Sequence, residues 1–417
     1  APFPINFTNE GDMYQYQATE DITGTLIESI ASGSNGCFPI AVFSGSSNIT
    51  FGSATCAGSS YDPLFQQLYP ITTWGKNFGF IPTADYPNGN ALRVMASEDN
   101  TTVYFNGVLT ATLNAGDIYP NAFISNPTLY TGPVNITADK PVCVAQYMPS
   151  LDCGGGGYGD PDMVILNPVE QNISDITIFS SSQQNITHHY VNILLKTIAI
   201  PSFTINGAAP SGTWQAFAAM PGYSYLKQIF PGSGSYRLKA DSGFNAIAYG
   251  FGTNYESYAF SAGTNVIDLY QTVGVSMLYG IEPTPSVCTN SPFKFKISLP
   301  YMADSIKWDF TSLPGSPPSV TTIYNNPPSP AVPPDSITVV NGKQIYWYSA
   351  PALYTFFTVG SFPVTIYTYA PNPEGCGTEQ ELNFDLDISD PPVPNISFTT
   401  PVCIAETVQF NDITPPG

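Results

Sequence analysis

Short apolar runs follow one another along the whole chain, and Gly, Pro, Asn or Ser separates each run from the next. Two of these runs, residues 103–105 and 203–205, are followed at once by Asn-Gly. Because Asn and Gly both accept positive φ, this dipeptide between β-branched or aromatic runs indicates a tight hairpin. Tyr, Phe, Thr, Val and Ile are plentiful, whereas the helix formers Lys, Glu and Leu are scarce. The pattern therefore predicts an all-β protein.

The pattern also repeats at an interval near one hundred residues, which predicts a fold built from copies of one unit. Residues 139–147 match residues 241–249 at both ends with an offset of 102, and the two Asn-Gly turns are offset by 100. Related turns at residues 11–14, 116–119 and 222–225 mark three copies. Each copy is expected to contain an Asn-Gly hairpin, a long loop, and two strands joined by a turn at an Asp. The first copy lacks its hairpin, so we expect the chain to begin inside a repeat.

The net charge of the chain excludes nucleic acids and anionic membranes as partners. The chain has 11 Lys and Arg against 31 Asp and Glu, a formal charge of −20 over 417 residues. So few basic residues cannot line a phosphate backbone or hold an anionic membrane surface, which excludes nucleic-acid binding. No apolar run is long enough to span a bilayer. Hydrophobic residues make up 43% of the chain, enough to bury large cores and to exclude wholesale disorder.

Seven cysteines indicate an oxidising compartment. None forms Cys-x-x-Cys and the only histidines are His188 and His189, so a zinc site has almost no ligands. Spacing favours three local disulfides, with separate buried thiols as the alternative: Cys37 with Cys56, Cys143 with Cys153, and Cys288 with Cys376. Disulfides place the protein outside the cytoplasm. Cys403 is left over, so we expect its partner beyond Gly417 and the chain to be a fragment.

Seven Asn-x-Ser/Thr sequons are compatible with the same location, because they become glycan sites in a host with that pathway. The candidate acceptors are Asn6, Asn48, Asn100, Asn135, Asn172, Asn185 and Asn395.

Three segments resemble one known family. Residues 97–103 (SEDNTTV), 136–142 (ITADKPV) and 73–78 (TWGKNF) are similar to signatures of the IgGFc-binding protein N-terminal domain family. The resemblance covers roughly residues 1–272 and departs at the N-terminus, where the usual opening segment of the family is absent. Immunoglobulin binding is not transferred to this chain by the resemblance.

Residues 273–390 have a different pattern. Trp308-Asp309-Phe310, followed by a strand at residues 359–365, is similar to PKD and related Ig-like modules, in which the Trp and the later strand pack across two sheets. Residues 314–334 are Pro-rich and predict a long exposed loop. Residues 390–394 predict a stiff linker, and residues 391–417 the start of a further module. The predicted fold is an all-β, repeat-built β-sandwich-type head domain over residues 1–272, followed by Ig-like or PKD-like β-sandwich modules.

One Gly-rich segment, residues 152–162, is a candidate metal site. Its three carboxylates, Asp152, Asp160 and Asp162, would surround Ca²⁺, since hard cations take oxygen ligands and glycine frees carbonyls to turn inward. The alternative is a loop closed by Cys143 and Cys153 and displayed at the domain rim. No other cofactor is expected.

No catalytic residue is predicted. His188 and His189 alternate faces on a strand, no Gly-x-Ser-x-Gly elbow surrounds a serine, and no carboxylate pair stands out.

The resemblance implies a cell-surface protein of the kind found in Bacteroidota, where this family precedes tandem PKD-like modules in long adhesins, some exported by the type IX route for gliding motility. We therefore expect a non-enzymatic extracellular protein that binds or displays to an external glycan or protein, or to other copies in a surface assembly. The alternatives are a secreted carbohydrate-active enzyme with PKD-like accessory modules and a self-assembling surface filament or layer.

Overall fold

The computed structural model divides into two compact units, formed by residues 1–28 with 41–269 and by residues 29–40 with 270–417. The predicted head domain extends to residue 272, three residues past this division. The structure describes all residues except 1–2, 31–39, 54–55, 57, 122–126, 155–156, 254, 267, 269–270, 278–279, 283–284, 324–332, 341–342, 371–378, 392, 394, 399–407 and 414–417.

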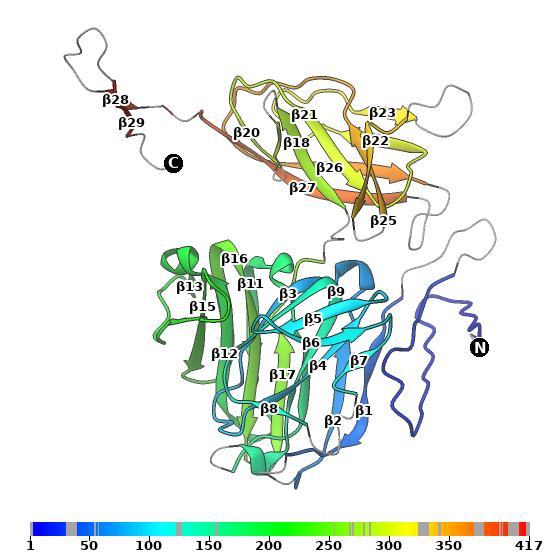
Figure 1. Ribbon diagram of the computed structural model, residues 1–417, viewed down its shortest axis with the longest axis vertical. Coiled ribbons are helices and arrows are strands. Elements are labelled where there is room, and N and C mark those ends of the chain that lie inside the picture. The colour runs from blue at the N-terminus through cyan, green and yellow to red at the C-terminus, as the bar shows by residue number, and fades with distance from the viewer. Residues whose placement is uncertain are drawn as a thin grey trace. The chain divides into compact units, whose positions relative to one another are not determined.

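The chain is all-β, as its pattern predicts (Figure 1). The strands of the first unit are β1 (Phe43–Ile49), β2 (Asp62–Gln67), β3 (Gly75–Phe80), β4 (Asn90–Ala96), β5 (Thr101–Phe105), β6 (Val108–Leu113), β7 (Ile118–Tyr119), β8 (Leu129–Tyr130), β9 (Val134–Met148), β10 (Asp162–Ile165), β11 (Ile173–Ser180), β12 (Ile186–Lys196), β13 (Thr204–Ile205), β14 (Gln215–Ala216), β15 (Tyr223–Phe230), β16 (Gly234–Gly252) and β17 (Glu256–Ser261). Its short 3₁₀ helices are η2 (Ile71–Thr73), η3 (Leu151–Cys153), η4 (Val169–Gln171), η5 (Gln183–Asn185) and η6 (Thr197–Ser202).

Two large sheets of the first unit are copies of one arrangement. Strand β9 is paired with β3, β4, β5 and β10, and strand β16 is paired with β11, β12, β13 and β17. The registers agree, because Tyr147 of β9 and Tyr249 of β16 lie opposite Met163 and Ala259 of the outer strands. The predicted offset of 102 is therefore the offset between structurally equivalent positions.

The two Asn-Gly turns have the same torsion angles and the same hydrogen bonds. Asn106 and Asn206 both have φ of 51°, and the glycine after each has φ of 79°. The Asn106 side-chain oxygen accepts a bond of 2.8 Å from the Asn135 amide, and Asn206 accepts one of 2.8 Å from the Arg237 amide. A backbone bond in the opposite direction completes both ladders. Each Asn thus closes its hairpin and also hydrogen-bonds the turn to the central strand, β9 or β16.

Two predictions about the repeat are wrong. Residues 3–30 contain no helix or strand, and their described side chains are almost all exposed, so the first predicted copy is not a third sheet. Strands β9 and β16 also run without interruption through the predicted Asp turns at Asp139 and Asp241. The two halves of β9 pair with different strands on either side of Pro141, which allows the strand to continue where the sequence suggests a turn.

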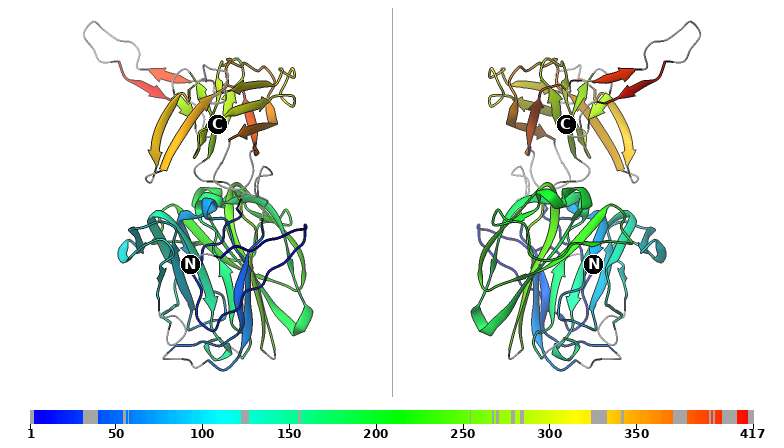
Figure 2. Two further views of the ribbon diagram at one scale, coloured as in Figure 1. Left: turned by 90° about the vertical axis from the view of Figure 1, so that its right-hand side faces the viewer. Right: turned by 90° about the vertical axis from the view of Figure 1, so that its left-hand side faces the viewer.

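Each of the two sheets, seen as cyan and green strands in Figure 2, encloses a core cluster made almost entirely of its own residues. Phe78, Phe80 and Ile136 of the first sheet are almost fully buried, as are Ile193 and Phe244 of the second. Burial of each such side chain contributes about 1.5–3 kcal/mol. The large aromatic content noted in the sequence is therefore used mainly inside the sandwich.

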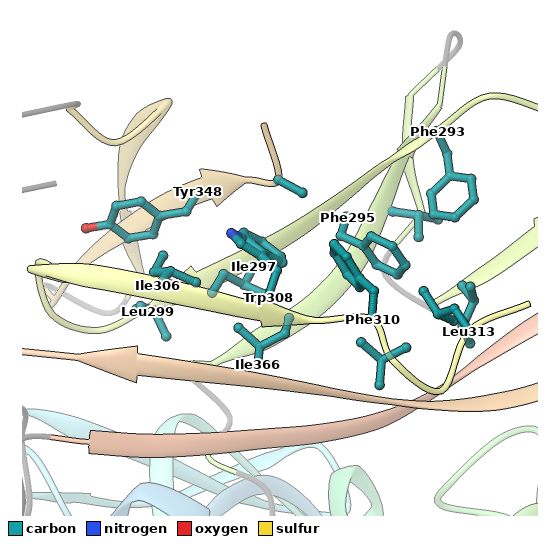
Figure 3. Close-up of a cluster of buried hydrophobic side chains, with 14 of the residues drawn as sticks. Phe293, Phe295, Ile297, Leu299, Ile306, Trp308, Phe310, Leu313, Tyr348 and Ile366 are labelled. Carbon is teal, nitrogen blue, oxygen red and sulfur yellow. The ribbon is translucent and has the colours of Figure 1, made fainter. Parts of the chain in front are cut away.

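The second unit is also a sandwich, of two five-stranded sheets. Its strands are β18 (Thr272–Met277), β19 (Gly280–Glu282), β20 (Ser286–Cys288), β21 (Lys294–Leu299), β22 (Ser305–Asp309), β23 (Val320–Ile323), β24 (Ser336–Val340), β25 (Lys343–Ser349), β26 (Gly360–Tyr369), β27 (Glu379–Ser389), β28 (Ile396–Phe398) and β29 (Phe410–Asp412). One sheet has the order β19-β18-β21-β25-β24 and the other β20-β27-β26-β22-β23, while β28 and β29 pair separately. Trp308, Phe295 and Phe310 stack in its core (Figure 3).

Trp308 occupies a different position from the predicted one. It is fully buried, but it lies opposite Ile366 of the neighbouring strand in the same sheet rather than facing that strand across the sandwich. The Pro-rich stretch 314–334 also contains strand β23, which the prediction of a long loop missed.

Candidate functional site

Three strands of the first unit begin at the same end of the sandwich. Strand β10 packs against both β2 and β17, which come from segments far apart in the sequence. The Gln66 side chain donates to the Ala259 carbonyl over 3.4 Å, and the Ser257 hydroxyl donates to the Asp160 carbonyl over 3.2 Å. The arrow of β17 in Figure 1 points away from the lower end of this unit, where the strand starts.

Each of these strands opens with an acidic residue. Asp62, Asp162 and Glu256 are the first residues of β2, β10 and β17, and Asp160 lies two residues before β10. Asp160 is 2% exposed, and the other three are partly buried. We refer to these four residues as the carboxylate end.

Burial and mutual repulsion raise the pKa values of three of the four. Burial raises the pKa of Asp162 to about 8, with Asp62 and Asp160 adding to the rise. Burial also raises the pKa of Asp62 to about 6, and Glu256 contributes. The pKa of Asp160 rises to about 6 through burial, with Asp62 and Glu256 adding. Carboxylates that raise one another's pKa in this way lie close enough to form one electrostatic group.

Two buried polar atoms beside the carboxylate end have no hydrogen-bond partner. They are the Asp160 Oδ1 oxygen and the Tyr86 hydroxyl, the latter on a side chain 4% exposed. Burial, with Asp160 and Asp162 adding, raises the pKa of the Tyr86 hydroxyl. It lies directly over Gly159, where a Cβ would come within 2.2 Å of the oxygen. Unpartnered buried polar atoms are costly and uncommon in folded proteins.

Exposed tyrosines adjoin two of the carboxylates. Tyr61 directly precedes Asp62 and is 60% exposed, and Tyr255 directly precedes Glu256 and is 56% exposed. Within the Gly-rich segment, the Tyr158 ring stacks on the His188 ring, with 4.2 Å between the ring centroids. We refer to Tyr61 and Tyr255, the exposed sequence neighbours of Asp62 and Glu256, as the aromatic rim of the carboxylate end.

One disulfide joins the chain beside this end, and it differs from the predicted pairs. Cys56 is bonded to Cys153, at a sequence separation of 97. The predicted pairs Cys37–Cys56 and Cys143–Cys153 are therefore wrong, because the sandwich brings together segments that are distant along the chain. Cys143 lies on β9 as a thiol outside any disulfide.

The remaining cysteine predictions fall partly outside the described residues. Cys288 is a free thiol in the structure, whereas Cys376, the partner predicted for it, lies outside the described residues. Cys37 and Cys403 also lie outside them.

The predicted calcium ligands do not come together as a set of three. Asp152 is exposed on η3, whereas Asp160 and Asp162 lie at the carboxylate end. No group of three or more His, Cys, Asp or Glu side chains in the described part of the chain is arranged to hold a metal ion. Sequence reasoning missed Asp62 and Glu256, because only the strand topology shows that their segments are neighbours of β10.

The sequons differ in accessibility. Asn135 and Asn172 are partly buried, and the Asn135 side-chain amide already donates to the Ala219 carbonyl over 2.8 Å. A glycan on Asn135 would have to be accommodated beside this bond, on the same nitrogen. The exposed candidates are Asn6, Asn48, Asn100, Asn185 and Asn395.

The histidines form no exposed catalytic pair. The His189 side chain is 4% exposed, and its Nδ1 is 2.8 Å from the Ser180 hydroxyl, which also contacts the Tyr258 hydroxyl at 2.6 Å. Burial, with a smaller effect of His188, lowers the pKa of His189. This arrangement satisfies polar groups inside the sandwich.

Two small cavities in the described part of the chain are not lined by the carboxylates. One of about 10 Å³ is lined by residues including Trp74 and Gln171, and one of about 20 Å³ by residues including Asn192 and Asn245. Each has room for little more than a water molecule. No helix among the described residues has the length and apolar character needed to cross a membrane.

Comparison with known proteins identifies the family. The family model described as IgGFc binding protein matches residues 3–250, which include both copies of the sheet up to β16. None of the curated proteins matches the chain. Because the family match covers more than half of the 417 residues, the chain belongs to the IgGFc-binding protein family.

Proposed function

We propose that this chain is the ligand-binding part of a non-enzymatic adhesin displayed at the cell surface. The family is typically extracellular, and the disulfide between Cys56 and Cys153 fits an oxidising compartment. In this proposal the first unit binds the ligand, and the PKD-like second unit is a spacer in a longer surface protein. Membership of a Bacteroidota gliding-motility system belongs to the same proposal and rests on the sequence resemblance alone.

The observation that carries the proposal is the aromatic-rimmed carboxylate end. Exposed polar and aromatic side chains on a rigid β-scaffold are disproportionately binding residues. Tyr61 and Tyr255 offer large, stiff contact surfaces, and the neighbouring Asp62 and Glu256 offer hydrogen-bond acceptors. Their strands are paired or packed against the sandwich, which holds the group in place without a ligand.

The test is a binding screen with the complete 417-residue chain. The chain is immobilised and exposed to extracellular proteins and to an array of glycans, with the immunoglobulin Fc fragment included because the family name specifies it. We expect selective, saturable binding to one class of probe. Binding to no probe at all would contradict the proposal.

A carbohydrate-active enzyme is the second candidate, and one observation favours it. Asp162 has a pKa raised to about 8 beside other carboxylates, which is the property required of a general acid in glycoside hydrolysis. Against it, the cavities described above are water-sized and are not lined by these residues. Hydrolysis of a glycan that the array identifies, abolished by Asp162→Asn, would establish the enzyme instead.

A further inference from the structure

The carboxylate end has no counter-charge within the described protein. The ion pairs found among the described residues use Asp21, Asp175 and Asp309, and none of them involves Asp62, Asp160, Asp162 or Glu256. Burial and neighbouring acids are the causes that raise the pKa values here, and no basic side chain offsets them. Isolated buried charge is costly unless it is paired, so the group is incompletely compensated on its own.

A second observation, independent of the charges, indicates that the group lacks a partner. The Tyr86 hydroxyl is buried beside Asp160 and Asp162, and no hydrogen-bond partner satisfies it. The Asp160 Oδ1 oxygen is likewise buried and unsatisfied, while the side chain accepts a bond from Ser60. A ligand that donates hydrogen bonds to such buried, unsatisfied atoms removes the free-energy cost of leaving them without partners.

The rim determines which kind of ligand fits. Tyr61 and Tyr255 are exposed beside Asp62 and Glu256, and tyrosine faces attract cations. Carboxylates with exposed tyrosines next to them in the chain suit guanidinium and ammonium groups, which donate several hydrogen bonds and carry positive charge. The chain itself has only 11 Lys and Arg, so it supplies few such groups of its own.

We propose that the carboxylate end recognises lysine or arginine side chains on an extracellular protein partner. This inference rests on the proposed function, because it names the chemistry of the ligand that the first unit binds. Asp62 and Glu256 at the rim make the first charge-assisted bonds, and Tyr61 and Tyr255 pack on the aliphatic stem or the cationic head. Asp160, Asp162 and Tyr86 lie deeper. Asp160 adds to the negative potential that the ligand meets, Asp162 adds to it where it is ionised, and the neutral Tyr86 hydroxyl offers a hydrogen-bond acceptor.

The test uses the complete chain and a fluorescent peptide of alternating arginine and glycine, with an alternating glutamate and glycine peptide as the comparison. Binding is measured by fluorescence anisotropy at about 150 mM salt, where long-range attraction is largely screened. We expect saturable binding of the basic peptide and none of the acidic peptide. Affinity should be at least about tenfold higher at pH 8 than at pH 5, because protonation neutralises the carboxylates whose pKa values are raised to about 6 and 8.

Matched variants locate the site. Asp62→Asn combined with Glu256→Gln should weaken binding at least about tenfold, whereas Glu20→Gln combined with Asp241→Asn changes the net charge equally at exposed positions and should leave affinity unchanged. Tyr61→Ala and Tyr255→Ala should each weaken binding about 2–5-fold. Removing repulsive charges should not unfold the protein, and thermal unfolding of each variant checks this.

Three results overturn the inference. The first is equal binding by the two double variants, and the second is equal binding of both peptides. The third is a rise in the unfolding temperature on adding calcium, together with no binding of the peptide. If the Asp62→Asn and Glu256→Gln double variant loses this rise, the carboxylate end is a divalent-cation site. If the chain binds a partner in the screen and the double variant binds it equally well, this inference fails while the proposed function stands.

Discussion

The two large sheets of the first unit share the same strand pairing and turns but differ in the side chains at the ends of their outer strands. Strands β9 and β16 have four corresponding neighbours each, and the Asn-Gly turns repeat with the same torsion angles and bonds. The outer strands β10 and β17 occupy equivalent places, yet Asp162 of β10 corresponds to Tyr258 of β17. Among the described residues, the disulfide-bonded Cys153 lies between β9 and β10, and no disulfide-bonded cysteine lies at the corresponding place between β16 and β17. The comparison teaches that the repeated residues build the scaffold, whereas the carboxylate end is assembled from residues that the copies do not share.

The largest expected effect concerns the disulfide that distinguishes the copies. Replacing both Cys56 and Cys153 by Ala should lower the free energy of unfolding of the first unit by about 2–5 kcal/mol, because the bond closes a long loop in the unfolded chain. Urea unfolding in non-reducing buffer, with the two units fitted as separate transitions, measures the loss. Cys143→Ala, at a thiol outside any disulfide, is the control and should cost less. A double variant as stable as the control would show that the disulfide does not stabilise the first unit.

The next effect tests whether the copies are equivalent. Asn106→Ala and Asn206→Ala should each cost about 1–2 kcal/mol, because each removes one side-chain bond and places alanine at a φ of 51°. The same unfolding experiment measures both. Asn→Asp at each position keeps the acceptor and should be nearly neutral. A large loss of free energy of unfolding at one turn and none at the other would show that the two turns are not equivalent.

The smallest expected effect is the pH dependence of the first unit's stability that arises from the carboxylate end. A carboxyl whose pKa is raised in the folded state favours the protonated form, so its contribution to stability is fully present at low pH. As pH rises above the ordinary value near 4 toward about 8 for Asp162, the unfolded state ionises first and the folded state loses stability. The first unit should therefore unfold at a lower temperature at pH 8 than at pH 5. Asp162→Asn should reduce this difference, whereas Asp152→Asn on exposed η3 should not.

Local sequence signals predicted the frame because they act over short distances. Alternating apolar runs gave the strand class, and Asn-Gly gave both hairpins since these residues accept positive φ. The offset of 102 between the central strands could be read because equivalent core positions need similar residues. The turns at Asp139 and Asp241 were predicted incorrectly, since polar residues where the pairing of a long strand is irregular resemble a turn.

The site could be predicted only in part, because it depends on contacts between distant segments. Asp160 and Asp162 stood out in the Gly-rich segment, but nothing local to Asp62 or Glu256 distinguishes them from other acidic residues. The same reason explains the disulfide error, since Cys56 and Cys153 are brought together by the sandwich and not by spacing. Strand order is the information that the sequence pattern lacked in both cases.

Direct titration of the carboxyl groups tests the central claim, that Asp62, Asp160, Asp162 and Glu256 form one uncompensated group. Carbon-detected NMR of the complete chain, with Asp and Glu carboxyls labelled and assigned through Asp→Asn and Glu→Gln variants, follows each group between about pH 3 and 9. The account predicts a pKa of about 8 for Asp162 and about 6 for Asp62 and Asp160, with Glu256→Gln lowering the values for Asp62 and Asp160. Ordinary values near 4 for all three aspartates, unaffected by Glu256→Gln, would contradict it.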